Sequence, residues 1–374
     1  MVRLWFKLFT LLFFFCGCSR IYMNDYSGQP VFKADSVEVV ANLSGPPGNI
    51  AVSRDHRIFF TFHPDGNPDI KVAEWTGGKA VPFPDSEFQK KRSGKPFFDT
   101  VLSLRIDAAN LLWTLDHGYF GIRQPRIMAF DIKTGQVVHE HEFHSDIAGF
   151  GSFLNDFQVS SSGDTIFIAD TGAPVPLIGG DPSIIVYDVK TKVARRVLED
   201  HASVRASDKT LRVGKEDFSL MGLSLKIAVD SIALDRENQW LYYGAVNGEK
   251  LYRIKASYLM DHALSPEALS SYVEVFADKT MSDGITTDLD GNIYISDMEH
   301  SAVHVIGQHR QLKTLIKDPA FRWPDGFSFG PDGWLYFTCS DLMNVVGKSE
   351  SHIKENAPYQ IFRFKPGGQG VPGH

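Results

Sequence analysis

The chain repeats one pattern of apolar and polar positions six times. Each repeat has an apolar strand, a polar or glycine-containing turn, and a second apolar strand with an aromatic residue at a fixed place. The six aromatic residues are Phe59, Trp113, Phe167, Tyr242, Tyr294 and Tyr336. Turns such as Asp290-Gly291 and Asp332-Gly333 supply the backbone conformations that tight hairpins need. The pattern therefore predicts six units of paired strands, without a long helix between them.

The spacing of these aromatic residues predicts a closed ring. Successive positions lie 54, 54, 75, 52 and 42 residues apart, and four-stranded blades of a β-propeller recur at roughly 40 to 50 residues. A β-sandwich is the structural alternative, but a ring of similar units leaves only short, protected strand edges. We predict an all-β fold, a six-bladed β-propeller over residues 37–366.

The longest step contains an insertion at residues 200–225 that is rich in Lys, Arg, Asp and Ser. Long surface loops are tolerated at modest free-energy cost, so we expect a solvated excursion. An extended hairpin or a lid over one face of the ring is the alternative.

The first eighteen residues differ from the rest of the chain. Arg3 and Lys7 flank the start of an apolar run at residues 8–15, and small residues follow, as is typical of a secretory signal. Residues 15–18 also resemble a bacterial lipobox, in which Cys18 would be the lipidated residue. Lipidation at Cys18 and plain cleavage both stay open.

These segments predict the domain organisation and the location. We expect a signal peptide over residues 1–18, a linker over 19–36 and a flexible tail over 367–374. The protein would be exported, either secreted or held in the cell envelope, with membrane contact only through a lipid anchor. One cysteine within the fold, Cys339, cannot form an internal disulfide, so stability must come from the core. We expect a monomer.

Charge removes one class of partner. The chain has 38 Lys and Arg residues against 45 Asp and Glu, a net charge of −7, and its longest basic run is Lys90-Lys91-Arg92. Nucleic-acid binding needs a basic patch or stripe. We therefore expect no nucleic-acid partner.

A set of polar residues precedes the first strands in one register. Counting back from the aromatic positions reaches Asn49, Asn155, Asp230, Asp283 and Asp325. The second repeat offers Asp99 or Thr100 less cleanly. Since the first strand of a blade lies innermost, these side chains are predicted to meet at one mouth of the central channel. For any single position, turn chemistry that leads into a strand is the alternative.

Clustered carboxylates at one mouth need compensation. Two charges about 5 Å apart repel by roughly 3 kcal/mol at an effective dielectric near 20. Asn155, Asp230, Asp283 and Asp325 would therefore favour Ca²⁺, which takes oxygen ligands. Otherwise the carboxylates would have a raised pKa or would bind a cationic ligand such as an amine. His117 follows a strand end and could face the same cavity, although a lone His is usually structural.

Several segments resemble the major royal jelly/Yellow protein family. The segments that carry the resemblance are residues 112–118, 153–159, 168–172, 241–243, 251–254 and 323–327. Together they cover roughly residues 37–364 in order, although Gly326 stands where the family often has Thr. The lipobox-like signal, and the lack of the disulfide cysteines of insect members, point to a bacterial relative.

The resemblance implies a propeller whose central cavity binds a small molecule, in some members an aromatic amine. More distantly related lactonase propellers hold a metal with similar Asn and Asp residues and a Glu before the first blade strand, but residues 45–49 contain no Glu. The first hypothesis is therefore a binder of an aromatic or cationic small molecule at Asn49, His117 and the four residues named for Ca²⁺. The second is a Ca²⁺-dependent hydrolase of lactones or esters, of the gluconolactonase type. A third, dopachrome-type isomerisation, rests on family analogy.

Overall fold

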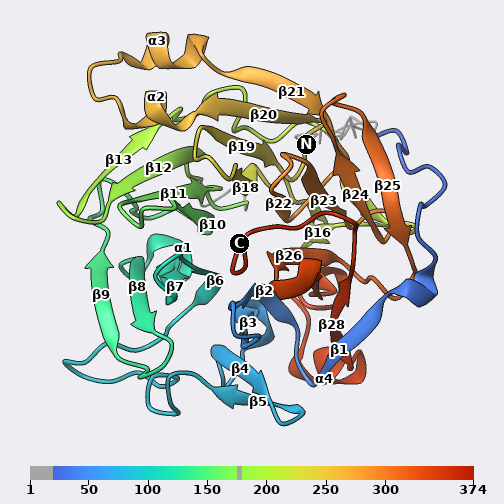
Figure 1. Ribbon diagram of the computed structural model, residues 1–374, viewed down its shortest axis with the longest axis horizontal. Helices are drawn as coiled ribbons and strands as arrows, with labels where there is room; N and C mark the ends of the chain where they lie inside the picture. The colour runs from blue at the N-terminus through green and yellow to red at the C-terminus, as the bar shows by residue number, and fades with distance from the viewer. Residues whose placement is uncertain (1–19, 175–178) are drawn as a thin grey trace, which may run out of the picture.

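Six four-stranded antiparallel sheets stand around one centre and form a six-bladed β-propeller (Figure 1). The computed structural model describes residues 20–174 and 179–374. The predicted fold class is therefore confirmed, and each of the six predicted strand pairs forms the two innermost strands of one blade. No helix in these two ranges is long and apolar enough to cross a membrane.

The blades follow one another along the chain, each from its inner to its outer strand. Blade one has β2 (Pro47–Val52), β3 (Ile58–Phe62), β4 (Val72–Thr76) and β5 (Lys79–Pro82). Blade two has β6 (Val101–Ile106), β7 (Leu111–Asp116), β8 (Arg126–Asp131) and β9 (Val137–Glu142). Blade three has β10 (Leu154–Val159), β11 (Thr165–Asp170), β12 (Ser183–Asp188) and β13 (Val193–Val197).

The second half of the ring continues in the same way. Blade four has β18 (Val229–Leu234), β19 (Trp240–Ala245), β20 (Lys250–Lys255) and β21 (Glu274–Asp278). Blade five has β22 (Ile285–Thr287), β23 (Ile293–Asp297), β24 (Ala302–Ile306) and β25 (Leu312–Lys317). Blade six has β26 (Pro324–Phe329), β27 (Leu335–Cys339), β28 (Tyr359–Phe364) and β1 (Glu38–Leu43). Short helices lie in the connections: α1 (Gly118–Gly121), α2 (Ala256–Met260), α3 (Pro266–Ser271) and α4 (Glu350–Glu355).

The ring is closed by a strand from the N-terminal side of the chain. β1 pairs antiparallel with β28, so it completes the sheet whose other three strands come from the C-terminal side. The two ends of the propeller are thereby hydrogen-bonded to each other. Closure of this kind protects the strand edges that an open sheet would expose.

The repeated aromatic residues pack between neighbouring blades. Each belongs to a different buried cluster: Phe59 lies with Leu104 of blade two, and Trp113 lies with Phe157 of blade three. The same relation holds around the ring for the other four. The fixed place in the sequence pattern therefore marks the side of the second strand that faces the next blade.

The C-terminal residues run into the centre of the ring, where Figure 1 shows the end of the chain. The Gly373 amide donates to the Phe329 carbonyl at 3.0 Å, and the Phe329 amide donates to the His374 carbonyl at 2.8 Å. The Ile106 amide donates to the Gly373 carbonyl at 3.1 Å. A side chain at position 373 would come within 2.6 Å of the Ile106 carbonyl oxygen, so the narrow channel requires glycine there. The structure thus differs from the flexible tail expected over residues 367–374.

The insertion at residues 200–225 folds over one mouth of the ring instead of extending into solvent. It contains two hairpins, β14 (Arg212–Val213) with β15 (Glu216–Asp217) and β16 (Ser219–Leu220) with β17 (Leu223–Ser224). Phe218 and Leu225 are buried, and the Phe218 ring lies 4.7 Å from the Trp323 ring of blade six. The expected solvated excursion is therefore wrong, because apolar residues between the charged ones give the insertion a buried side. We call residues 211–225 the cap.

Candidate functional site

The capped mouth of the channel contains a cavity of about 360 Å³. All six residues that the sequence analysis selected line it: Asn49, His117, Asn155, Asp230, Asp283 and Asp325. Four of them lie at the start of the innermost strand of a blade, Asp283 lies just before such a strand, and His117 lies in the connection after β7. Residues that are up to 276 positions apart in the sequence are therefore brought to one place.

β-Bulges aim most of these side chains into the cavity. The pairing register between first and second strands shifts at Asn49, at Asn155, at Asp230 and at Asp325. A bulge inserts an extra residue, bends the strand and redirects a side chain. In blade five the inner strand β22 is short, and Asp283 lies just before it. In these five blades the polar residue therefore stands where the hydrogen-bonded pairing of the two inner strands is interrupted or has not yet begun.

Blade two departs from the pattern. Its bulge lies between Val101 and Ser103, and the residue that lines the cavity there is Leu102. The two sequence candidates lie elsewhere: Thr100 donates through its hydroxyl to Asp116 at 2.8 Å, and Asp99 pairs with Arg123. The position counted back from the aromatic residue gave no cavity residue in blade two, because Asp99 and Thr100 bond to residues at and after the end of β7 instead.

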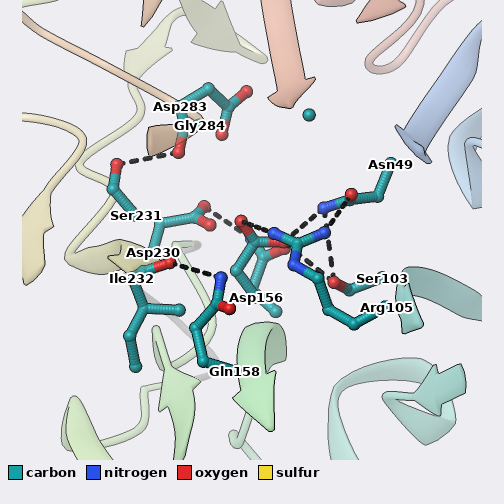
Figure 2. A network of polar contacts seen from close by, with 12 residues as sticks. Asn49, Ser103, Arg105, Asp156, Gln158, Asp230, Ser231, Ile232, Asp283 and Gly284 are labelled. Carbon is teal, nitrogen blue, oxygen red and sulfur yellow. Dashed lines mark hydrogen bonds and ion pairs between the residues drawn. The ribbon is translucent and has the colours of Figure 1, made fainter. Parts of the chain in front are cut away.

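A buried hydrogen-bond network forms the floor of the cavity (Figure 2). The Arg105 guanidinium, 1% exposed, donates to Asn49 Oδ1 and lies 3.4 Å from Asp156 Oδ2. Asn49 Nδ2 donates to Asp156 Oδ1 at 2.6 Å, and the Ser103 hydroxyl donates to the same oxygen at 2.9 Å. Arg105 and Asp156 were not predicted from the sequence. A charged residue inside the apolar strand Val101–Ile106, and an acid directly after Asn155, were the available signals.

The acidic groups outnumber the buried cations beside them. Asp156, Asp230 and Asp283 are buried and Asp325 is partly buried, whereas the described cations among them are Arg105 and Lys279. Lys279 Nζ donates to the backbone carbonyls of Ala245 and Thr280, at 2.7 and 3.0 Å, rather than to a carboxylate. Burial lowers the pKa of Lys279 to about 7. The base of the cavity therefore has an excess of acidic groups.

Burial shifts the acids toward their protonated forms. It is the largest cause of the raised pKa of Asp230, followed by the charge of Asp283. Burial also raises the pKa of Asp283 to about 7, and burial with the Asp283 charge raises the pKa of Asp325 well above its ordinary value. Asn155 Nδ2 donates to Asp230 Oδ2 and Trp323 Nε1 donates to Asp283 Oδ2, each at 2.5 Å. A cation that entered the cavity would favour the ionised forms.

The walls above these acids are apolar. The residues that form them are Leu102, Phe120, Phe153, Phe218, Leu220, Leu225, Ile227, Leu342 and Val346. The cap contributes Phe218, Leu220 and Leu225. The cavity therefore has a polar, acidic end and an aromatic, aliphatic end, which is the usual composition of a small-molecule site.

His117 belongs to the aromatic wall. Its ring meets the Phe153 ring edge to face, with centroids 4.8 Å apart, and its Nδ1 accepts the Phe120 amide at 3.3 Å. Burial lowers the pKa of His117 to about 3, so the ring is neutral at physiological pH. Neutral His117 offers a polar contact on this wall, beside His63 and Asp65, which also line the cavity.

The four residues predicted to hold calcium share the cavity without forming a metal site. Across residues 20–174 and 179–374, no three His, Cys, Asp or Glu side chains are placed to hold one ion. Asp230 and Asp283 each accept a hydrogen bond from a neighbouring side chain, and Asp156 lies against Arg105. The oxygen donors suit Ca²⁺ in kind, but hydrogen bonds from Asn155 and Trp323 already occupy Asp230 and Asp283.

Comparisons with known proteins agree with this architecture. A family model described as "Major royal jelly protein" matches residues 100–326. No curated protein sequence matches the chain.

Solved structures share the fold at low sequence identity. A luciferin-regenerating enzyme is 12% identical, with 90% of this chain and 97% of that chain covered and a TM-score of 0.57. A gluconolactonase from Xanthomonas campestris is 15% identical, with 88% and 89% covered and a TM-score of 0.55. Regucalcin, a calcium-binding protein from Agrobacterium tumefaciens, is 14% identical, with 92% and 98% covered and a TM-score of 0.57. At such identities the likeness shows the fold alone.

Proposed function

The chain belongs to the major royal jelly protein family, and on that premise we propose that it binds an amine with an aromatic body in the central cavity. The observation that carries the proposal is the excess of acids below aromatic walls, of which Asp156, Asp230 and Asp283 are buried and Asp325 is partly buried. The ammonium group of the ligand would supply the positive charge that balances these acids. The aromatic body of the ligand would match the apolar walls above them.

Each part of such a ligand has a counterpart in the cavity. The ammonium group would lie among Asp230, Asp283 and Asp325, where charge-assisted hydrogen bonds in a buried site are stronger than neutral ones. The ring would lie between Phe153 and Phe218, which offer edge-to-face or offset contacts. A cavity of about 360 Å³ suits a ligand of this size.

Matched ligands test the proposal. 2-Phenylethylamine should raise the melting temperature of the purified protein, whereas 2-phenylethanol and 3-phenylpropionate should not, because they share the ring but lack the positive charge. Asp325→Asn should abolish most of the shift. Asp35→Asn, on the exposed turn before β1, should retain it. An equal shift with the alcohol would contradict the proposal.

Export and lipid anchoring are proposed on the sequence alone. The signal over residues 1–18 and the lipidation of Cys18 lie outside the described residues. The apolar run and the lipobox-like segment support a secreted protein or a lipoprotein of the cell envelope. Mass spectrometry of the mature N-terminus decides between a lipid-modified Cys18 and an unmodified cleavage product.

Calcium-dependent hydrolysis of a lactone or ester is the second candidate. The excess of acids that would attract an amine would also attract Ca²⁺, although the side chains must first rearrange to coordinate it. Calorimetric titration with CaCl₂, together with lactone turnover before and after chelation, tests this candidate. Turnover that is lost on chelation supports it, and the absence of both calcium binding and turnover rejects it.

A further inference from the structure

We propose that the rim of the capped mouth docks on a lipid bilayer. Large apolar side chains are exposed on the loops that surround the cavity: Tyr119 at 52%, Ile122 at 62%, Phe150 at 69%, Met221 at 95% and Leu223 at 53%. We call these five residues the rim. Soluble proteins scatter single apolar residues over their surfaces, but a group around one opening indicates an interaction site.

The rim residues lie beside residues that line the cavity. Tyr119 precedes Phe120, and Met221 follows Leu220, both of which form the cavity wall. The loop that carries Phe150 is joined to the first pair, because the Gly151 amide donates to the Phe120 carbonyl at 3.0 Å. The exposed apolar groups therefore border the opening itself.

The backbone at two rim positions disfavours the residues that occupy them. Met221 forms the tip of the β16–β17 hairpin with a φ of 51°, and Tyr119 has a φ of 58°. Gly, Asn or Asp are the usual residues in this left-handed region, because a larger side chain costs free energy there. The Tyr119 ring packs against the Arg123 guanidinium at 4.7 Å, whereas Met221, 95% exposed, is the position at which the proposed contact would offset the strained backbone.

The described N-terminal residues end on the same face as the rim. Arg20 pairs with Asp217 of the cap, and the Thr210 amide donates to the Ile21 carbonyl at 2.7 Å. The Arg212 guanidinium lies 3.7 Å from the centre of the Tyr22 ring. Cys18 precedes Arg20 by two residues, a span of at most about 7 Å. An anchor at Cys18, or a retained apolar run at residues 8–15, would therefore hold the cap and its mouth at the membrane.

The place where the N-terminal segment joins the cap favours a bilayer over a second copy of this chain, because the apolar run at residues 8–15 and Cys18 precede Arg20 there. The exposed charges at the mouth balance one another: Lys348 and Asp65 both line it, and Lys215 and Glu216 both lie at the turn between β14 and β15. The contact would therefore rest on the apolar rim residues. The inference does not depend on the identity of the cavity ligand.

Hydrogen exchange of the full chain, with and without vesicles of phosphatidylethanolamine and phosphatidylglycerol, tests the docking. Vesicles should slow exchange in residues 119–123, 149–152 and 219–224, and should leave residues 193–197 of β13 unchanged. Unchanged exchange in the three rim segments, for a chain that sediments with the vesicles, overturns the proposal. Slowed exchange that depends on protein concentration without vesicles also overturns it, in favour of self-association.

Substitutions that introduce charge at the rim separate its contribution from that of the anchor. In a Cys18→Ala chain, Phe150→Asp with Met221→Asp should lower partitioning onto the same vesicles at least about tenfold, since each change replaces an apolar side chain that would enter the bilayer with a charged one. Val193→Asp with Val275→Asp, both 54% exposed on outer strands, is the matched control and should have no effect. Equal loss in both pairs would contradict a rim-specific contact.

Discussion

Asp283 connects the stability of the fold to the chemistry of the cavity. Its carboxyl group accepts the Trp323 indole N–H, and burial raises its pKa to about 7. In the unfolded chain the same group titrates near its ordinary value of about 3.9. Between these two values the native state retains a proton that the unfolded chain has lost. The free energy of unfolding contributed by this residue therefore falls as pH rises through that window.

Asp283→Asn should remove this dependence. Asparagine keeps the acceptor for Trp323 but cannot ionise, so the stability of the variant relative to the wild type should be higher at pH 8 than at pH 5, by roughly 2–3 kcal/mol. Thermal unfolding followed by circular dichroism at both pH values measures the difference. A stability difference that is the same at pH 5 and pH 8 would show that Asp283 is not protonated in the native state.

For single residues, the sequence predicted which side chains line the cavity better than it predicted the side chains that they bond to. Asn49, Asp230 and Asp325 were found because one strand register recurs in each blade, and the bulge recurs with it. Arg105 and Asp156 were missed because a single charged residue in an apolar strand reads equally well as a surface position. Only the ring geometry shows that Arg105 lies against Asn49 of the preceding blade.

Among the larger elements, the cap has the clearest consequence for binding. It carries Phe218 onto Trp323, a contact between residues 105 positions apart, and closes one side of the cavity. The sequence predicted the paired strands because each has its own apolar pattern and turn residues. The cap hairpins are only two residues a strand, too short for such a pattern.

Phe218→Ala should weaken ligand binding and the fold together. The ring is 4% exposed, so its removal should lower the free energy of unfolding by about 3 kcal/mol and the affinity for 2-phenylethylamine by about tenfold. Leu223→Ala, on the exposed side of the cap, should change stability by less than about 0.5 kcal/mol. Denaturant unfolding and calorimetry on both variants give the comparison. Unchanged affinity in Phe218→Ala would exclude the cap from the binding site.

For the molecule as a whole, both ends of the chain complete the ring. β1 closes blade six, and residues 372–374 lie in the channel between β6 and β26. The six-fold repeat made the ring predictable from the sequence, whereas the C-terminal segment was not. Its Gly and Pro residues have no strand periodicity, and its bonds are to residues about 45 and about 265 positions away.

Deletion of residues 371–374 should loosen the centre of the ring. The Ile106 and Phe329 amides lose their acceptors on Gly373 and His374, so their hydrogen exchange should become at least about tenfold faster. His374→Ala retains the backbone carbonyl and should leave both amides protected. Unaltered exchange in the truncated chain would mean that the C-terminal segment does not close the channel in solution.

Calorimetric titration of 2-phenylethylamine at pH 6 and pH 8 examines the acidic cavity most directly. The amine stays cationic at both pH values, while the Asp283 carboxyl group, whose pKa burial raises to about 7, changes charge between them. We predict tighter binding at pH 8, by up to about tenfold for each pH unit, with protons released on binding at pH 6 and weak binding by Asp325→Asn at both. Affinity that is independent of pH, or equal for 2-phenylethanol, would contradict an ammonium site formed by buried acids.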